Sequence, residues 1–232
     1  MSTVFIIGGA GKVGRRLARI LTEKGHAVHA LHRQPEQAHL IRQQGAMPVS
    51  GSLTELDAEA LATMMRGCDV VVFSAGADGK GGPEMTNAID GEGFKTAAEA
   101  AALASISRFP LMFARLARNG GASAFALTSA TGANVGSRFF YNLVKGELEQ
   151  ALRQENFPSL TLVRPGVIAG DRAESRPGEA ALKQVLRLLS PILPRSWQLS
   201  PAEDIARHLL TAVTTPRSGI HIVSAGEINS AR

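Results

Sequence analysis

The chain has 232 residues, of which 44% are hydrophobic and 19% are charged, and its formal net charge is +5. This composition supplies a buried core and excludes a disordered chain, and the length suggests one large domain or two small ones. The single cysteine, Cys68, excludes an internal disulfide framework and a zinc site built from cysteines. The sequence contains no continuous apolar stretch of the length that a membrane-spanning helix needs, so we expect a single-domain cytoplasmic protein.

Short apolar runs alternate with longer stretches of helical spacing along the whole chain, which predicts repeated strand–helix–strand units. The predicted strands are Thr3–Ile7, Ala27–Leu31, Ala46–Val49, Val70–Ser74, Ala124–Thr128, Thr161–Val163 and Ile220–Val223. The predicted helices are Gly11–Lys24, Glu55–Arg66, Gly93–Ser105, Asn142–Glu155, Glu179–Leu189 and Ala202–Val213. Because the strands are almost continuously apolar, we expect an α/β fold around a parallel sheet that is buried on both faces.

Two segments are less regular than the rest. Residues 76–93 contain six glycines and follow a predicted strand, which is typical of a loop. Residues 105–121 fit either a strand that is broken by Pro110 or the start of another helix, and periodicity does not decide between them. We expect a loop and then a helix there, before the strand at Ala124.

The clearest local motif is a G-x-x-G-x-x-G turn, which directly follows the first apolar strand and opens an amphipathic helix. Gly8 provides the tight turn, Gly11 allows a close approach to the backbone, and Gly14 lets the helix pack on the strand. The free N–H groups at the start of the helix, from Lys12 and Val13, would then hold a pyrophosphate. This motif predicts a dinucleotide site in a doubly wound parallel sheet of the Rossmann type.

The end of the second strand bears on which dinucleotide is bound. An NAD site places an Asp or Glu there to accept hydrogen bonds from the ribose, but this chain has Arg33 and no carboxylate before Glu36. Arg33 is suited to bind a 2′-phosphate, and Lys12 adds a second positive charge. The sequence therefore favours NADP(H) over NAD(H), although Arg33 could also be an ordinary solvated residue after a strand.

A second constellation lies in the middle of the chain. Tyr141, the only tyrosine, stands four residues before Lys145, so that both side chains share one face of a predicted helix. Ser129 lies twelve residues upstream, at the end of a predicted strand. In a proton-transfer unit, Ser129 would orient a substrate carbonyl, Tyr141 would transfer the proton, and Lys145 would hold the ribose and lower the pKa of the tyrosine. The alternative is a surface pair on a helix.

These motifs resemble the short-chain dehydrogenase/reductases, in their atypical NAD(P)-binding branch. The resemblance covers essentially the whole chain and includes the segments 69–76 and 164–167. The run 171–179 is similar to the NmrA-like and Tat-interacting-protein-like oxidoreductases, which bind NADP. The resemblance implies further cofactor contacts, some of them at the nicotinamide, from Ala75, Gly76, Pro165, Gly166 and Val167.

Two functions are compatible with this sequence. The first is an NADP-dependent oxidoreductase that transfers a hydride to or from a small carbonyl or alcohol, with a small substrate-side region at about residues 166–215. The second is an NADP(H)-binding sensor or regulatory protein without turnover, and the fold alone does not decide between them. An epimerase or dehydratase acting on nucleotide sugars would need a larger C-terminal region.

Other partners are not favoured by the sequence. His26, His29 and His32 recur every third residue, but they lie in or beside a strand, where that spacing alternates faces, so we expect no metal site. The basic surface of the first helix lacks interleaved aromatic side chains, so we expect no nucleic acid partner. The expected partner is a small-molecule substrate, and the sequence does not determine the oligomeric state.

Overall fold

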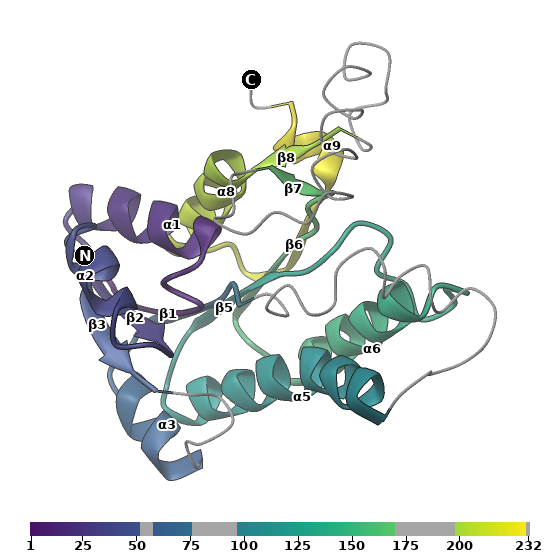
Figure 1. Cartoon of the computed structure of the whole chain (residues 1–232), viewed down its shortest axis with the longest axis horizontal. Coiled ribbons are helices and arrows are strands. Elements are labelled where there is room, and N and C mark those ends of the chain that lie inside the picture. Colours follow the sequence, from purple (N-terminus) through teal and green to yellow (C-terminus); the bar gives the residue numbers. More distant parts are fainter. Residues whose placement is uncertain (52–57, 76–96, 170–197, 231–232) are drawn as a thin grey trace.

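The computed structural model describes residues 1–51, 58–75, 97–169 and 198–230. Its main sheet has seven parallel strands in the order β3-β2-β1-β4-β5-β6-β9 (Figure 1). These strands are β1 (Thr3–Ile7), β2 (Ala27–His32), β3 (Met47–Ser50), β4 (Val70–Phe73), β5 (Ala124–Thr128), β6 (Ser159–Val163) and β9 (Gly219–Val223). A separate parallel pair is formed by β7 (Ile168–Ala169) and β8 (Ser200–Pro201).

Helices cover both faces of the sheet, as the sequence predicts for a doubly wound fold (Figure 1). One face carries α1 (Lys12–Glu23), α2 (Gln37–Arg42) and α8 (Ala202–Thr214), and the other carries α3 (Ala58–Met65), α5 (Ala97–Asn119) and α6 (Phe140–Gln154). The short helix α9 (Ala225–Ile228) follows β9. Residues of β1 alternate between two buried clusters: Val4 and Ile6 belong to the first, and Phe5 and Ile7 to the second. The predicted Rossmann-type fold is therefore confirmed.

The strand order reverses beside β1, which pairs with β2 on one side and with β4 on the other. In parallel sheets of this kind, ligands bind outside the carboxyl ends of the strands at such a reversal. The carboxyl ends of β1, β4, β5 and β6 lie next to one another at this edge, and each is followed by a predicted site residue. The topology thus gathers the candidate site from four separate segments of the chain.

The helix α5 differs from the prediction for residues 105–121. The structure has one continuous helix with Pro110 inside it, so the expected loop is wrong. Proline removes one helical hydrogen bond and costs about 3 kcal/mol in a helix interior. After Pro110, however, Phe113, Ala114 and Ala117 are fully or almost fully buried against the sheet, and this packing outweighs the local preference.

Other differences from the predicted elements are small. The six-residue helix α2 is not predicted, β3 begins one residue later than expected, and β6 begins two residues earlier. The predicted loop at 76–93 and the predicted helix Glu179–Leu189 lie outside the described residues, as does Gly76. Within the described ranges, no helix is both long and apolar enough to cross a membrane.

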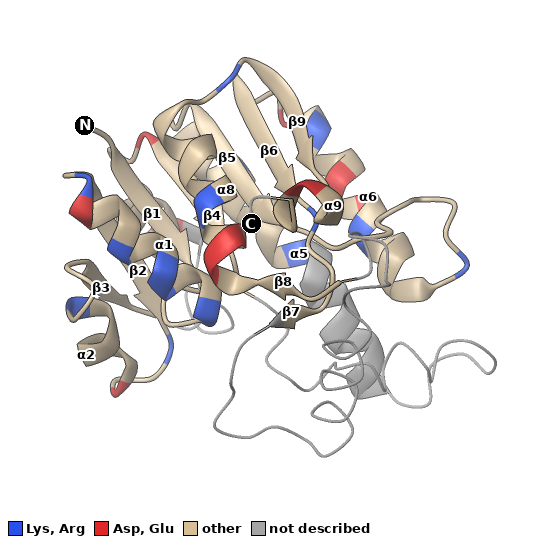
Figure 2. Ribbon diagram, turned by 90° about the horizontal axis from the view of Figure 1, so that it is seen from above, with Lys and Arg blue, Asp and Glu red and all other residues tan. Residues whose placement is uncertain are grey.

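The basic surface of α1 faces acidic residues of α8, as Figure 2 shows. Glu203 lies 3.6 Å from Arg16 and 3.2 Å from Arg19, measured between the charged atoms. Both pairs are substantially exposed, so each contributes at most about 1 kcal/mol. Part of the positive charge on α1 is therefore balanced within the chain.

Candidate functional site

The glycine turn joins the end of β1 to the start of α1. Gly8 has a φ of +83°, and a Cβ on it would lie 2.6 Å from the backbone nitrogen of Ala75, just after β4. A Cβ on Gly14 would lie 2.3 Å from the carbonyl oxygen of Gly8. Glycine at these two positions therefore lets the turn, the helix and the next strand pack against one another, as the sequence motif predicts.

The third glycine of the turn, Gly11, has more space. Within the described residues, only the carbonyl oxygen of Gly8 lies within 4 Å of a Cβ built on Gly11, at 3.1 Å. Gly11 is also the N-cap of α1, and no side chain of the described part of the chain caps it. The positive dipole end of the helix therefore has no side-chain cap within the described residues. This cradle fits the pyrophosphate of a dinucleotide.

Charged residues lie on both sides of this cradle. Lys12 is the first residue of α1, and Arg33 is exposed directly after β2. The backbone N–H groups of Arg33 and Gln34 both donate to the side-chain oxygen of Gln37, at 3.2 Å, which orders the segment that carries Arg33. The order of these elements places Arg33 one strand away from the turn, at the same sheet edge.

Tyr141 and Lys145 lie on one face of α6, one turn apart. The Nζ atom of Lys145 is 5.9 Å from the centre of the Tyr141 ring. Lys145 is buried, and this burial lowers its pKa to about 8, against the opposing effect of the negative charge of Glu149. Burial also raises the pKa of Tyr141 above its usual value. Lys145 alone therefore does not produce the lowered pKa that the sequence predicts for Tyr141.

Ser129 does not bond to Tyr141 or Lys145 in this arrangement. Its hydroxyl donates to Oε1 of Glu149 at 2.6 Å, and Glu149 lies on α6 one turn beyond Lys145. Arg164, directly after β6, donates from Nε to the same oxygen at 3.0 Å and from Nη2 to Oε2. We call Ser129, Lys145, Glu149 and Arg164 the charged cluster. Sequence reasoning missed the part played by Glu149, although its i+4 spacing from Lys145 places it on the same helix face.

The residues after β6 are held by the loop that follows β5. The N–H of Thr131 donates to the carbonyl of Pro165 at 2.9 Å, and the N–H of Gly166 donates to the hydroxyl of Ser200 at 3.0 Å. Val167 is 40% exposed, so its side chain is available to a ligand. At the ends of β5 and β4, the hydroxyl of Thr128 donates to that of Ser74 at 3.2 Å. Residues 165–167 therefore lie at the same sheet edge as the glycine turn.

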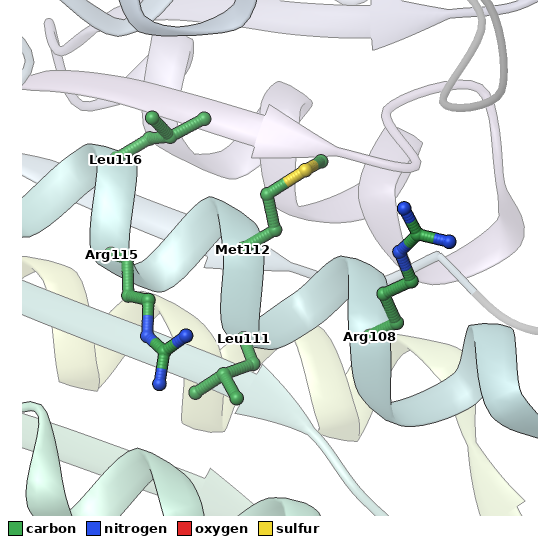
Figure 3. Close-up of a pocket in the computed structure, with 5 residues that line it drawn as sticks. All are labelled: Arg108, Leu111, Met112, Arg115 and Leu116. Atoms are coloured by element: carbon green, nitrogen blue, oxygen red, sulfur yellow. The ribbon is translucent and has the colours of Figure 1, made fainter. Parts of the chain in front are cut away.

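A hollow of about 370 Å³ lies elsewhere, along α5 (Figure 3). It is lined by Arg108, Leu111, Met112, Arg115 and Leu116, all from this one helix. Arg115 forms an exposed ion pair with Glu155 at 2.9 Å. None of the predicted site residues lines this hollow, because they gather at the strand ends.

Comparison with known proteins identifies the family. A model of an NAD(P)H-binding family matches residues 8–191, a range that contains the glycine turn, Tyr141 and Lys145. The chain belongs to this NAD(P)H-binding family. The predicted resemblance to an atypical, NAD(P)-binding branch is therefore confirmed at the level of the family.

The curated relatives of this NAD(P)H-binding protein match it over part of its length. It is 37% identical to the uncharacterized sugar epimerase YhfK of Bacillus subtilis over 117 residues. This match covers 50% of this chain and 54% of the relative. It is 39% identical to protein HTATIP2 of Rattus norvegicus over 114 residues. This match covers 48% of this chain and 46% of the relative. The chain thus spans about half the length of the curated relatives it matches.

Among solved structures, a mutant short-chain dehydrogenase/reductase of Serratia marcescens has a TM-score of 0.70 to this NAD(P)H-binding protein. The superposition covers 98% of each chain at 16% sequence identity. At this level of identity, the likeness shows a shared fold.

Proposed function

We propose that the chain is an NADP-dependent oxidoreductase that reduces a small carbonyl compound or oxidises the corresponding alcohol. The observation that carries this proposal is the pair of Tyr141 and buried Lys145 on α6. Glu149 bonds this helix to residues that follow β5 and β6, at the same sheet edge as the glycine turn. Membership of the NAD(P)H-binding family supports the cofactor class. The proposal includes a small-molecule substrate as partner and the cytoplasm as location.

The cofactor would be held mainly by backbone. The N–H groups that follow Gly11 would bind the pyrophosphate, and the guanidinium of Arg33 would bind the 2′-phosphate that distinguishes NADP from NAD. Residues 165–167 would line the nicotinamide, and Lys145 would donate to the ribose hydroxyls. When bound, the dinucleotide supplies or accepts the hydride.

Tyr141 would supply the proton in the reducing direction. Burial raises its pKa, so the phenol is protonated at neutral pH and can donate to the oxygen of a carbonyl as negative charge develops there. The ammonium of Lys145, close to the ring, would stabilise the phenolate that is left after the proton has moved. Reduction is therefore the direction that the protonation state of this site favours.

A second candidate function is an NADP(H)-binding sensor without turnover. The observation that favours it is the hydrogen bond from Ser129 to Glu149, because the hydroxyl proton is then not available to a substrate carbonyl. An enzyme would have to orient its substrate with other groups, whereas a sensor would need only the cofactor site.

The experiment that tests the proposal is a titration with NADPH and NADH, followed by a screen of NADPH oxidation over aldehydes, ketones and quinones. We expect NADPH to bind at least several-fold more tightly than NADH, and one class of carbonyl compound to be reduced. Equal affinities would contradict the assignment of NADP. Tight binding of NADPH without oxidation by any of the compounds would favour the sensor.

A further inference from the structure

Glu149 has a position that the proposed roles of Tyr141 and Lys145 do not explain. Its side chain is almost completely buried on α6, at 2% exposure. A buried carboxylate is costly unless both of its oxygens are paired. Here Oε1 accepts from Ser129 and Arg164, and Oε2 accepts from Arg164, so the charge is fully bonded within the protein.

The partners of Glu149 come from two neighbouring strand ends. Ser129 directly follows β5 and Arg164 directly follows β6, and their backbones are already joined because the N–H of Ser129 donates to the carbonyl of Val163 at 2.7 Å. The carboxylate of Glu149 therefore links α6, which carries Tyr141 and Lys145, to the sheet edge at one point. A change in this link would move side chains on both sides of it.

The bond also decides what Ser129 offers to a ligand. A serine hydroxyl has one proton and two lone pairs, and the proton is held by Glu149 at 2.6 Å. Ser129 is therefore left with lone pairs, which accept hydrogen bonds. This differs from the donor role that the sequence analysis assigns to it.

Glu149 also faces the charge of Lys145. The two side chains are one helical turn apart, and the negative charge of Glu149 favours the ammonium form of the lysine, against the cost of burial. Two further ionisable groups lie nearby in the described residues: Tyr141, whose phenol is neutral at pH 7, and Arg164, which is ion-paired with Glu149.

We propose that Glu149 is a positioning residue of the candidate site, whose buried carboxylate, held by Arg164, fixes the hydroxyl of Ser129 and maintains the ammonium of Lys145. This inference deepens the proposed function and rests on it for the role of Lys145, while Ser129 takes the role of a hydrogen-bond acceptor at the site. Glu149 itself need not touch the substrate or the cofactor.

The first test needs neither cofactor nor turnover. The chain has six lysines, so the protein can be labelled with [ε-13C]lysine and its lysine signals followed by NMR as the pH is raised, with Lys145→Met to assign the signal of Lys145. Glu149→Gln removes one negative charge from one helical turn away, which should lower the titration midpoint of Lys145 by about one pH unit or more. An unchanged midpoint in folded Glu149→Gln would overturn the proposal.

Two controls separate this effect from a general loss of charge or packing. Glu147→Gln removes an exposed glutamate from the same helix, two residues away, and should leave the midpoint in place because solvent screens its charge. If Glu149→Gln does not fold, Arg164→Gln is the second variant. It keeps the carboxylate and removes the cation that is paired with it, so the negative charge of Glu149 is less neutralised and the midpoint should rise by about half a pH unit or more. A fall or no change would contradict the proposal.

The second test uses the carbonyl compound found in the NADPH-linked screen. Ser129→Ala and Glu149→Gln should each lower kcat, and the double variant should be little slower than the slower single variant, since both changes break one hydrogen bond. Independent effects that multiply would contradict the link through Ser129. If no compound is reduced, the proposed oxidoreductase function fails, but the NMR midpoints still decide whether Glu149 positions Lys145.

Discussion

The glycine turn and the charged cluster lie at the same edge of the sheet, but they are built in different ways. The turn consists of backbone, and its geometry depends on missing side chains at Gly8 and Gly14. The charged cluster consists of side chains from α6 and from the residues that follow β5 and β6. The charges of Lys145 and Glu149 are buried, and Arg164 compensates that of Glu149. One region is fixed by steric fit and the other by electrostatics.

Because of this difference, the two regions should respond differently to pH. A site made of backbone N–H groups has no titrating group of its own, so its geometry should not depend on pH. A site made of buried ionisable side chains changes its charge state when the pH crosses their shifted pKa values. Variants in the two regions should therefore fail in different experiments, and the following predictions use that contrast.

The largest effect is expected at Tyr141. Tyr141→Phe removes one hydroxyl and keeps the ring, so folding and NADPH affinity should hardly change. Turnover should fall by roughly 10²–10⁴-fold, the usual contribution of a positioned acid. The measurement is the steady-state rate of NADPH oxidation beside a cofactor titration. Turnover at the unmutated rate would show that this region is not catalytic.

Lys145→Met should change how stability depends on pH. The folded protein releases the Lys145 proton near pH 8, whereas the unfolded chain keeps it to about 10.5, so this group destabilises the fold at neutral pH and ceases to do so as the pH rises. The variant should therefore be more stable at pH 7 by about 3 kcal/mol, and this advantage should vanish towards pH 10.5. Urea unfolding at several pH values measures it.

The comparison with the variant is needed because other buried groups titrate in the opposite sense. Burial raises the pKa of Cys68 to about 11 and also raises that of Tyr141, so both groups destabilise the fold as the pH rises above their ordinary values. Their contributions are common to both proteins and cancel in the difference. Parallel stability curves for the two proteins would contradict the buried, uncharged state of Lys145 above pH 8.

Arg33→Ala tests the turn side of the site. The variant should lose most of the preference for NADPH, on the order of 10- to 100-fold, because a charge-assisted contact to the 2′-phosphate contributes roughly 1.5–3 kcal/mol. The affinity for NADH should hardly change. Gln34→Ala, beside Arg33, is the matched control and should retain the preference. A full preference in Arg33→Ala would place 2′-phosphate recognition elsewhere.

The smallest effects on stability are expected within the turn itself. Gly14→Ala brings a Cβ to 2.3 Å from the carbonyl oxygen of Gly8, which should cost about 1–3 kcal/mol of stability in urea unfolding. Gly11→Ala, with its nearest contact at 3.1 Å, should cost less. Gly11→Val should stay folded by circular dichroism but lose NADPH binding, because the branched side chain occupies the space of the pyrophosphate. Retained binding would make the turn purely structural.

Much of the fold could be predicted from the sequence because its signals are local. All seven strands of the sheet follow from short apolar runs, and the turn at Gly8–Gly14 follows from a spacing within seven residues. The helix α5 could not be predicted in the same way. Its continuation through Pro110 depends on burial against the sheet, which is a tertiary effect that overrides the local preference.

The site could be predicted in part for the same reason. Tyr141 and Lys145 are four residues apart on one helix, so their pairing is visible in the sequence. The bonds of Glu149 join residues that are 20 and 15 positions away, from two different strands. No local pattern indicates them, and the donor role predicted for Ser129 follows from a motif that contains no carboxylate. Contacts between residues that are far apart in the sequence therefore limited the prediction of the site, whereas the local motifs were visible.

The position of β1 has a consequence for synthesis of the chain. β1 leaves the ribosome before the other strands of the sheet and can pair with β2 once residues 27–32 have emerged, but its other edge is completed by β4, where Val4 pairs with Val70. Until then, an apolar strand carries unpaired backbone groups on one side, the arrangement that favours pairing with other chains. Nascent chains stalled before residue 70 should therefore associate readily, whereas chains that have released β4 have closed this edge.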